Sequence, residues 1–123
     1  MARASIGCVA VIDDDPGVLV SLEAVLEVAG YQVVAYASAG AFLADHAAKP
    51  ACLILDQHMP QMTGLDLAAR LRADGVHLPV LLISGKPPSN LAARAAELGI
   101  AKVLVKPLSA DDLLCFVAAS IGS

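Results

Sequence analysis

Short apolar runs rich in β-branched residues alternate along the chain with longer segments whose apolar residues recur every three or four positions. Runs of the first kind are typical of strands, and helical spacing is typical of amphipathic helices. Five strands are therefore predicted, at Cys8–Ile12, Gln32–Tyr36, Cys52–Asp56, Pro79–Ser84 and Lys102–Lys106. A helical segment follows each strand, which gives five strand-helix repeats.

The helical segments also carry signals at their ends. In the first segment an apolar stripe precedes Gly30, a residue type common just past a helix C-terminus; the stripe is Val18, Leu22, Val25 and Leu26. Asp15 is predicted to cap this helix. The later helices are predicted at Ser38–Ala47, Gly64–Asp74, Ser89–Leu98 and Ser109–Ile121, with Ser38, Ser89 and Ser109 as N-caps.

The third and fourth predicted strands are almost continuous apolar runs. Such runs are expected where helices cover both faces of a parallel sheet. The pattern predicts a doubly wound α/β fold, built as one domain over residues 1–123 with no output domain in this chain. Ligands of such sheets bind at the carboxyl ends of the strands, so functional residues are expected in the loops after them.

Composition narrows the class of protein. Hydrophobic residues make up 58% of the chain, but no apolar run approaches the roughly 18 residues of a membrane-spanning helix. We therefore predict that the protein is cytoplasmic and has no membrane partner. A net charge of −4 without a Lys/Arg cluster argues against direct nucleic-acid binding. Cys8, Cys52 and Cys115 are spaced too widely for a disulfide framework or a zinc site and are predicted to be buried thiols.

Polar residues gather at the predicted strand ends, namely Asp13, Asp14 and Asp15 after the first strand, Asp56 on the third, Ser84 on the fourth and Lys106 on the fifth. The ends of four strands thus converge on one acidic pocket. Clustered carboxylates repel one another and need a cation. Oxygen ligands favour a hard ion, and we predict Mg²⁺, with Mn²⁺ as a substitute, held by Asp14 and Asp56 with Asp13 nearby.

Lys106 and Ser84 are suited to binding a phosphoryl oxygen, because Lys106 brings an ammonium and Ser84 a hydroxyl to the carboxylates. A carboxylate nucleophile can take up a phosphoryl group as an acyl phosphate when metal and ammonium offset the charge on its oxygens. Asp56 lies on the central strand that this chemistry requires.

From about Cys8 to Ile121 the chain resembles the response-regulator receiver family of two-component signal transduction. The matching elements are Asp13-Asp14, the segment from Asp56-Gln57-His58-Met59-Pro60 to Gly64, the pair Ser84-Gly85, and Lys106-Pro107. The similarity is greatest to receivers of transcriptional regulators, on the segments Val11–Pro16 and Ser38–Leu43. It implies a flavodoxin-like (βα)5 sheet in strand order 2-1-3-4-5. It also implies a signalling domain that is not an enzyme beyond catalysing its own phosphorylation and dephosphorylation.

The resemblance implies a role for each residue of the metal site. Asp56 would be the phosphoacceptor and a Mg²⁺ ligand, and Asp14 would ligate the ion directly. Asp13 would act mostly through water, and the backbone carbonyl of His58 would be a further ligand. The His58 side chain itself is expected to face solvent.

The resemblance likewise implies how the phosphoryl group is held. Lys106 would pair with it, Ser84 would hydrogen-bond it in the activated state, and Gly85 would leave it a path into the site. A cis peptide before Pro107 would aim Lys106 inward. The donor would be a sensor histidine kinase or a histidine phosphotransfer protein. A partner or output domain would use the face formed by the last two predicted helices and the strand between them, Ser89–Ile121.

The sequence departs from the family at several positions. Many receivers carry an aromatic switch residue where this chain has Val103, and valine has no ring to relocate. Leu108 replaces an aromatic residue often found after Lys-Pro. The prolines after Lys86 predict a stiff loop. His58 and Lys86 occupy positions that tend to influence the lifetime of the acyl phosphate.

Two other classes remain open. A pseudo-receiver, a structural interaction domain without the chemistry, would show no saturable Mg²⁺ binding that depends on Asp14. The other class is an enzyme built on a similar sheet. A phosphatase of the aspartyl-phosphate type would need a second Asp where this chain has His58. In a flavin protein, the acidic residues Asp13–Asp15 would repel the phosphate of the cofactor.

Overall fold

One parallel sheet forms the centre of the molecule, and the computed structural model describes residues 8–45, 49–100 and 102–121. The strands are β1 (Cys8–Ile12), β2 (Gln32–Tyr36), β3 (Cys52–Asp56), β4 (Val80–Ser84) and β5 (Lys102–Val105). They lie in the order β2-β1-β3-β4-β5, and each pairing is parallel. The helices are α1 (Pro16–Val28), α2 (Ala39–Ala44), α3 (Gly64–Ala73), α4 (Leu91–Glu97) and α5 (Ala110–Ile121). The predicted fold class and strand order are confirmed.

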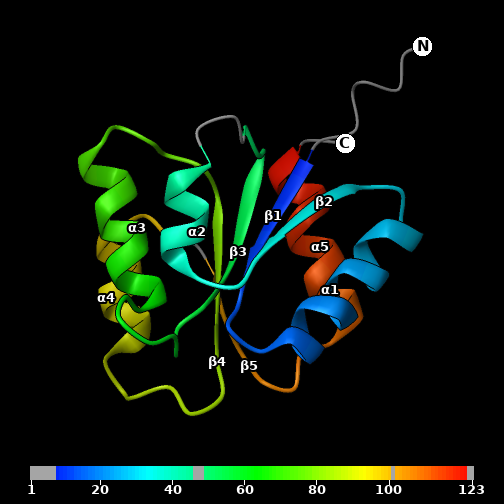
Figure 1. Cartoon of the computed structure of the whole chain (residues 1–123). Helices are drawn as coiled ribbons and strands as arrows, with labels where there is room; N and C mark the ends of the chain where they lie inside the picture. The colour runs from blue at the N-terminus through cyan, green and yellow to red at the C-terminus, as the bar shows by residue number, and fades with distance from the viewer. Residues whose placement is uncertain (1–7, 46–48, 101, 122–123) are drawn as a thin grey trace.

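Helices cover both faces of the sheet (Figure 1). On one face, Leu26 of α1 and Val117 of α5 share a buried cluster with Ile54 of β3. On the other, α2, α3 and α4 pack over a second cluster that includes Leu53 and Leu82. Every residue of β3 and β4 is buried, because alternate side chains meet helices on opposite sides. Within the described ranges, no helix has both the length and the hydropathy needed to cross a membrane.

Capping residues begin three helices where the sequence predicts them. The side chains of Asp15 and Ser38 accept hydrogen bonds from backbone N–H groups in the first turns of α1 and α2. Ser109 does the same for α5. Gly30, just past α1, has a φ of +101°, in the left-handed region that favours glycine. Each of these residues therefore has its predicted place.

The prediction of Ser89 as a helix N-cap is wrong. The N-cap of α4 is Asn90, whose side chain makes no capping hydrogen bond. The N–H of Leu91 instead donates to the carbonyl of Pro88 at 3.0 Å. This turn closes directly after the two prolines and moves the N-cap by one residue, from Ser89 to Asn90.

Helix α2 ends earlier than predicted. Its C-cap is Asp45, where the backbone leaves the helical region. The hydroxyl of Tyr36 donates a 2.7 Å hydrogen bond to Asp45 Oδ2, which ties the helix end to β2. The predicted end of this helix, at Ala47, lies outside the described residues.

The three cysteines differ in burial. Cys52 is buried within β3 and Cys8 is partly buried, but Cys115 is exposed. The prediction of a buried thiol at Cys115 is wrong, because the face of α5 that packs on the sheet is formed by Leu113, Phe116 and Val117.

Candidate functional site

Three carboxylates meet at the carboxyl ends of β1 and β3. One oxygen from each of Asp13, Asp14 and Asp56 lies within 4.8 Å of the others. Strands β1 and β3 are neighbours, with Ile12 opposite Leu55, so the residues that follow them are brought side by side. Asp13 and Asp56 are 1% and 3% exposed, whereas Asp14 is exposed to solvent. The structure thus brings together the predicted acidic residues.

The buried carboxylates are incompletely satisfied. Asp13 Oδ1 accepts a 2.9 Å hydrogen bond from the Asp15 N–H. Asp13 Oδ2 and Asp56 Oδ1 are buried and have no hydrogen-bond partner among the described residues. Burial raises the pKa of Asp13. The hydrogen bond from the Asp15 N–H lowers this pKa and the nearby charge of Asp56 raises it, and the net shift is upward. Two unsatisfied anionic oxygens beside an exposed third carboxylate fit a hard divalent cation.

The side chain of Lys106 places a positive charge beside two of these carboxylates. Its Nζ lies 3.3 Å from Asp56 Oδ1 and 3.8 Å from Asp13 Oδ2. Burial by itself lowers the pKa of this lysine, but the charges of Asp13 and Asp56 outweigh burial and the pKa is raised. Lys106 is therefore an ammonium at neutral pH. The peptide bond between Lys106 and Pro107 is cis, as the resemblance to the receiver family implies.

Ser84 and His58 form a contact that sequence reasoning missed. Ser84 is fully buried at the end of β4, and its Oγ lies 3.1 Å from Nε2 of His58. His58 is exposed as expected, yet its ring edge reaches back to the hydroxyl. No pattern along the chain indicates this pairing, because it joins residues 26 positions apart through a side-chain rotamer.

The loop between β3 and α3 is fixed at both ends. Gln57 is buried, its N–H donates to the carbonyl of Ile83 at 2.8 Å, and its Oε1 accepts from the Leu65 N–H at 2.9 Å. Thr63 and Asp66 form a reciprocal capping box at the start of α3. This loop carries His58, so its backbone is held in a defined place beside the carboxylates.

The remaining predicted positions lie around the cluster. A Cβ atom at Gly85 would sit 3.9 Å from Cδ of Lys106, an ordinary contact, so space alone does not require glycine there. Lys86 is exposed on the next loop, and in the described part of the chain it forms no ion pair. Val103 is partly buried and packs against the core on the side of α2, α3 and α4.

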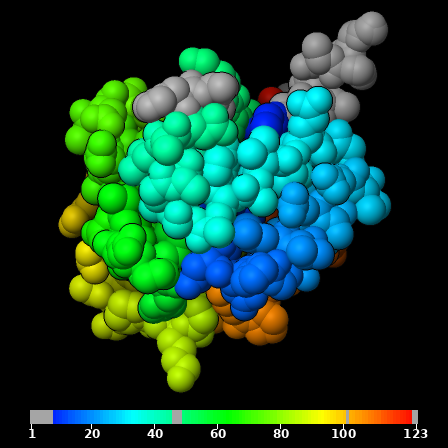
Figure 2. All heavy atoms as spheres, in the orientation of Figure 1, coloured from blue at the N-terminus to red at the C-terminus, as the bar shows by residue number. Residues whose placement is uncertain are grey.

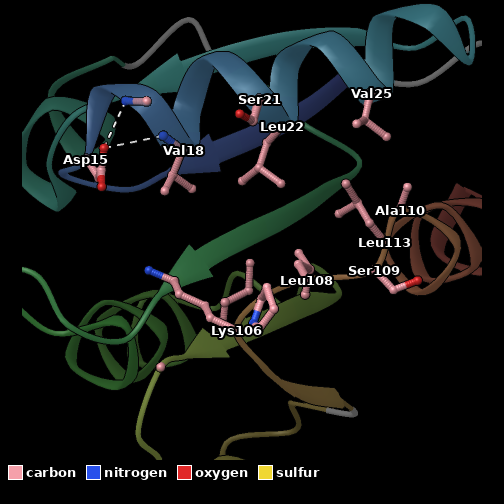
Figure 3. A pocket seen from close by; sticks show the side chains of 14 residues that line it. Asp15, Val18, Ser21, Leu22, Val25, Lys106, Leu108, Ser109, Ala110 and Leu113 are labelled. Carbon is pink, nitrogen blue, oxygen red and sulfur yellow. Dashed lines mark hydrogen bonds between the residues drawn. The ribbon is translucent and has the colours of Figure 1, made fainter.

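The site opens at one edge of the molecule. In Figure 2 the start of α1 (blue), the segment after β4 (yellow-green) and the segment after β5 (orange) meet at the lower edge. Beside them lies a groove of about 650 Å³. Figure 3 shows apolar side chains facing across it, Val18, Leu22 and Val25 from α1 and Leu108 and Leu113 from the opposite wall. Lys106 lines this groove as well, so the groove adjoins the carboxylate cluster.

The fold and the cluster of acidic residues with one lysine define a class of protein. The sequence profile of the response regulator receiver domain matches residues 9–118. The chain therefore belongs to the response regulator receiver family, whose members are signalling domains of two-component systems.

Individual relatives agree with this assignment. Transcriptional regulatory protein FixJ of Azorhizobium caulinodans is 39% identical over 113 residues, which cover 91% of this chain and 54% of FixJ. Response regulator protein TodT of Pseudomonas putida is 34% identical over 120 residues, 97% of this chain and 52% of TodT. The crystal structure of FixJ-N has a TM-score of 0.85 at 26% identity and covers 94% of both chains. The chain spans about half the length of these two curated relatives.

Proposed function

We propose that Asp56 accepts a phosphoryl group from a phosphorylated histidine of a sensor kinase or phosphotransfer protein in a Mg²⁺-dependent reaction. An oxygen of Asp56 attacks phosphorus, the P–N bond breaks, and the freed imidazole takes up a proton. The observation that carries the proposal is the buried, unsatisfied Asp56 Oδ1 with the Lys106 ammonium 3.3 Å away. Burial keeps competing water from the acceptor oxygen, and the ammonium offsets the added negative charge.

The same site would hold the metal ion. Asp14 and Asp56 would bind it directly, Asp13 mostly through water, and His58 through its backbone carbonyl. When bound, Mg²⁺ neutralises charge on the phosphoryl oxygens. The clustered carboxylates support this proposal, because they carry three potential charges against one lysine.

Lys106 would pair with the phosphoryl group once it has formed, and Ser84 would hydrogen-bond it in the activated state. Gly85, at the exposed start of the next loop, would leave the group room to enter. His58 and Lys86 would tune the lifetime of the acyl phosphate through their positions at the mouth of the site.

A partner or output domain would respond through the face formed by α4, β5 and α5. Strand β5 is an edge strand, and Val105 on it is 53% exposed. Because Val103 is too small to move as an aromatic switch residue does, the response is expected to depend on backbone shifts of β5 and its neighbours. That the chain binds no nucleic acid directly stays a prediction.

Incubation with Mg²⁺ and a small phosphodonor is expected to add one phosphate to the intact protein. The acceptor carboxylate, the lysine and the metal ligands all belong to this chain, so no second protein is needed. Intact-mass spectrometry measures the increment, and chelation of the metal is expected to prevent it. A folded protein that binds Mg²⁺ but stays unmodified would contradict the proposed function.

Replacing Asp14 with alanine is expected to weaken Mg²⁺ binding by roughly tenfold or more, because a direct ligand is lost. Asp14 is exposed, so the fold should persist. Isothermal titration measures the affinity, and Asp74→Ala, which removes an exposed aspartate that forms an ion pair with Arg70 at 3.6 Å, is the matched control. If both variants bind Mg²⁺ like the unaltered protein, the metal site is misassigned and a structural interaction domain becomes the better description.

A further inference from the structure

The contact between His58 and Ser84 has a defined direction. Ser84 is 0% exposed, so its hydroxyl hydrogen cannot bond to bulk water. A buried donor without an acceptor is costly. Within the described residues, Nε2 of His58 at 3.1 Å is the only hydrogen-bonding partner of Ser84 Oγ. The hydroxyl therefore donates to the imidazole, since the reverse arrangement would leave its own hydrogen without an acceptor.

The backbone on both sides of this contact is anchored. The carbonyl of Ser84 accepts from the Lys106 N–H at 3.0 Å, and the N–H of Gln57 donates to Ile83 at 2.8 Å. His58 follows Gln57 directly, so its Cα is fixed relative to the end of β4. The pairing can therefore open by rotation of the Ser84 or His58 side chain without movement of either strand.

We propose that His58 is a positioning residue that holds the Ser84 hydroxyl in the unphosphorylated protein, so that a phosphoryl group on Asp56 must take the hydroxyl from the imidazole. The inference rests on the proposed function of Asp56. Ser84 has a single hydroxyl hydrogen, and phosphoryl oxygens only accept. The Ser84 hydroxyl can therefore donate either to His58 or to a phosphoryl oxygen, but not to both. The hydrogen bond to His58 consequently opposes the activated state.

Binding of beryllium trifluoride, a tetrahedral phosphoryl analogue, in saturating Mg²⁺ tests this competition. His58→Leu is expected to bind the analogue roughly two- to tenfold more tightly, the factor that one hydrogen bond contributes. His58→Gln, whose amide oxygen can accept from the hydroxyl, is expected to stay close to the unaltered protein. His77→Leu, the same change at an exposed histidine before β4, is expected to have no effect.

The same titrations in a Ser84→Ala background show whether His58 acts through the hydroxyl. There His58→Leu is expected to lose its effect on the affinity for the analogue. Unchanged or weaker binding by His58→Leu, or an equal gain without the hydroxyl, would overturn the inference. If the unaltered protein binds no beryllium trifluoride in Mg²⁺, the proposed function of Asp56 fails first; if it binds and His58 has no effect, only this inference fails.

Discussion

Replacement of Asp56 with asparagine is expected to reduce phosphate incorporation from a small phosphodonor to background. The amide has nearly the shape of the carboxylate but no anionic oxygen to attack phosphorus. The fold should persist, because the change neutralises a buried carboxylate whose Oδ1 has no hydrogen-bond partner among the described residues. Intact-mass spectrometry after a fixed incubation measures the loss, and thermal unfolding checks that the protein is folded.

Asp74→Asn is the matched control for this variant. Asp74 has a side chain that is 57% exposed and forms an ion pair with Arg70, and it caps the C-terminal end of α3, the end opposite Gly64. This control should take up phosphate like the unaltered protein. Undiminished incorporation by Asp56→Asn would mean that another residue accepts the phosphoryl group.

Replacement of Gly64 with alanine is expected to lower the free energy of unfolding by about 3 kcal/mol. A Cβ atom at this first residue of α3 would lie 2.6 Å from Cδ1 of Leu82 and 2.8 Å from the backbone carbonyl oxygen of Asp56. The second contact cannot be relieved by a rotamer change, because it involves the backbone of β3. Urea unfolding measures the loss, and Mg²⁺ affinity should fall with it as Asp56 is displaced.

Gly40→Ala provides the comparison within another helix. Among the described residues, a Cβ at Gly40 would meet only Ser38 Oγ, at 3.9 Å, and alanine favours the helical backbone. This variant is expected to be as stable as the unaltered protein or more stable by up to about 1 kcal/mol. If Gly64→Ala proves equally stable, the close approach of α3 to the end of β3 does not constrain the site as described.

The sequence could predict those features that depend on local periodicity and on the geometry of parallel sheets. The strand ends at Ile12 and Asp56 follow from apolar runs that stop at carboxylates, and the parallel order brings these ends to one edge. The cis bond before Pro107 was expected from resemblance and is confirmed. Lys106 reaches the carboxylates because β5 is parallel to β4 and ends on the same edge of the sheet.

Other features depend on contacts that no local pattern encodes. Ser89 has the residue type of an N-cap, but the turn that Pro88 begins places Asn90 there instead. The exposure of Cys115 depends on which stripe of α5 packs on the sheet. The hydrogen bond from Ser84 to His58 requires the loop after β3 to be fixed by Gln57, whose two hydrogen bonds join β4 and α3. The sequence shows each residue but not these distances.

Asp56 is expected to become an acyl phosphate in a site that needs a divalent ion. Peptide mapping by mass spectrometry after reaction with a phosphodonor, with and without Mg²⁺, tests it most directly. The expected result is one phosphate, carried only by the peptide that contains Asp56 and found only in the sample with Mg²⁺. Phosphate on another peptide, or equal labelling without the metal, would contradict it.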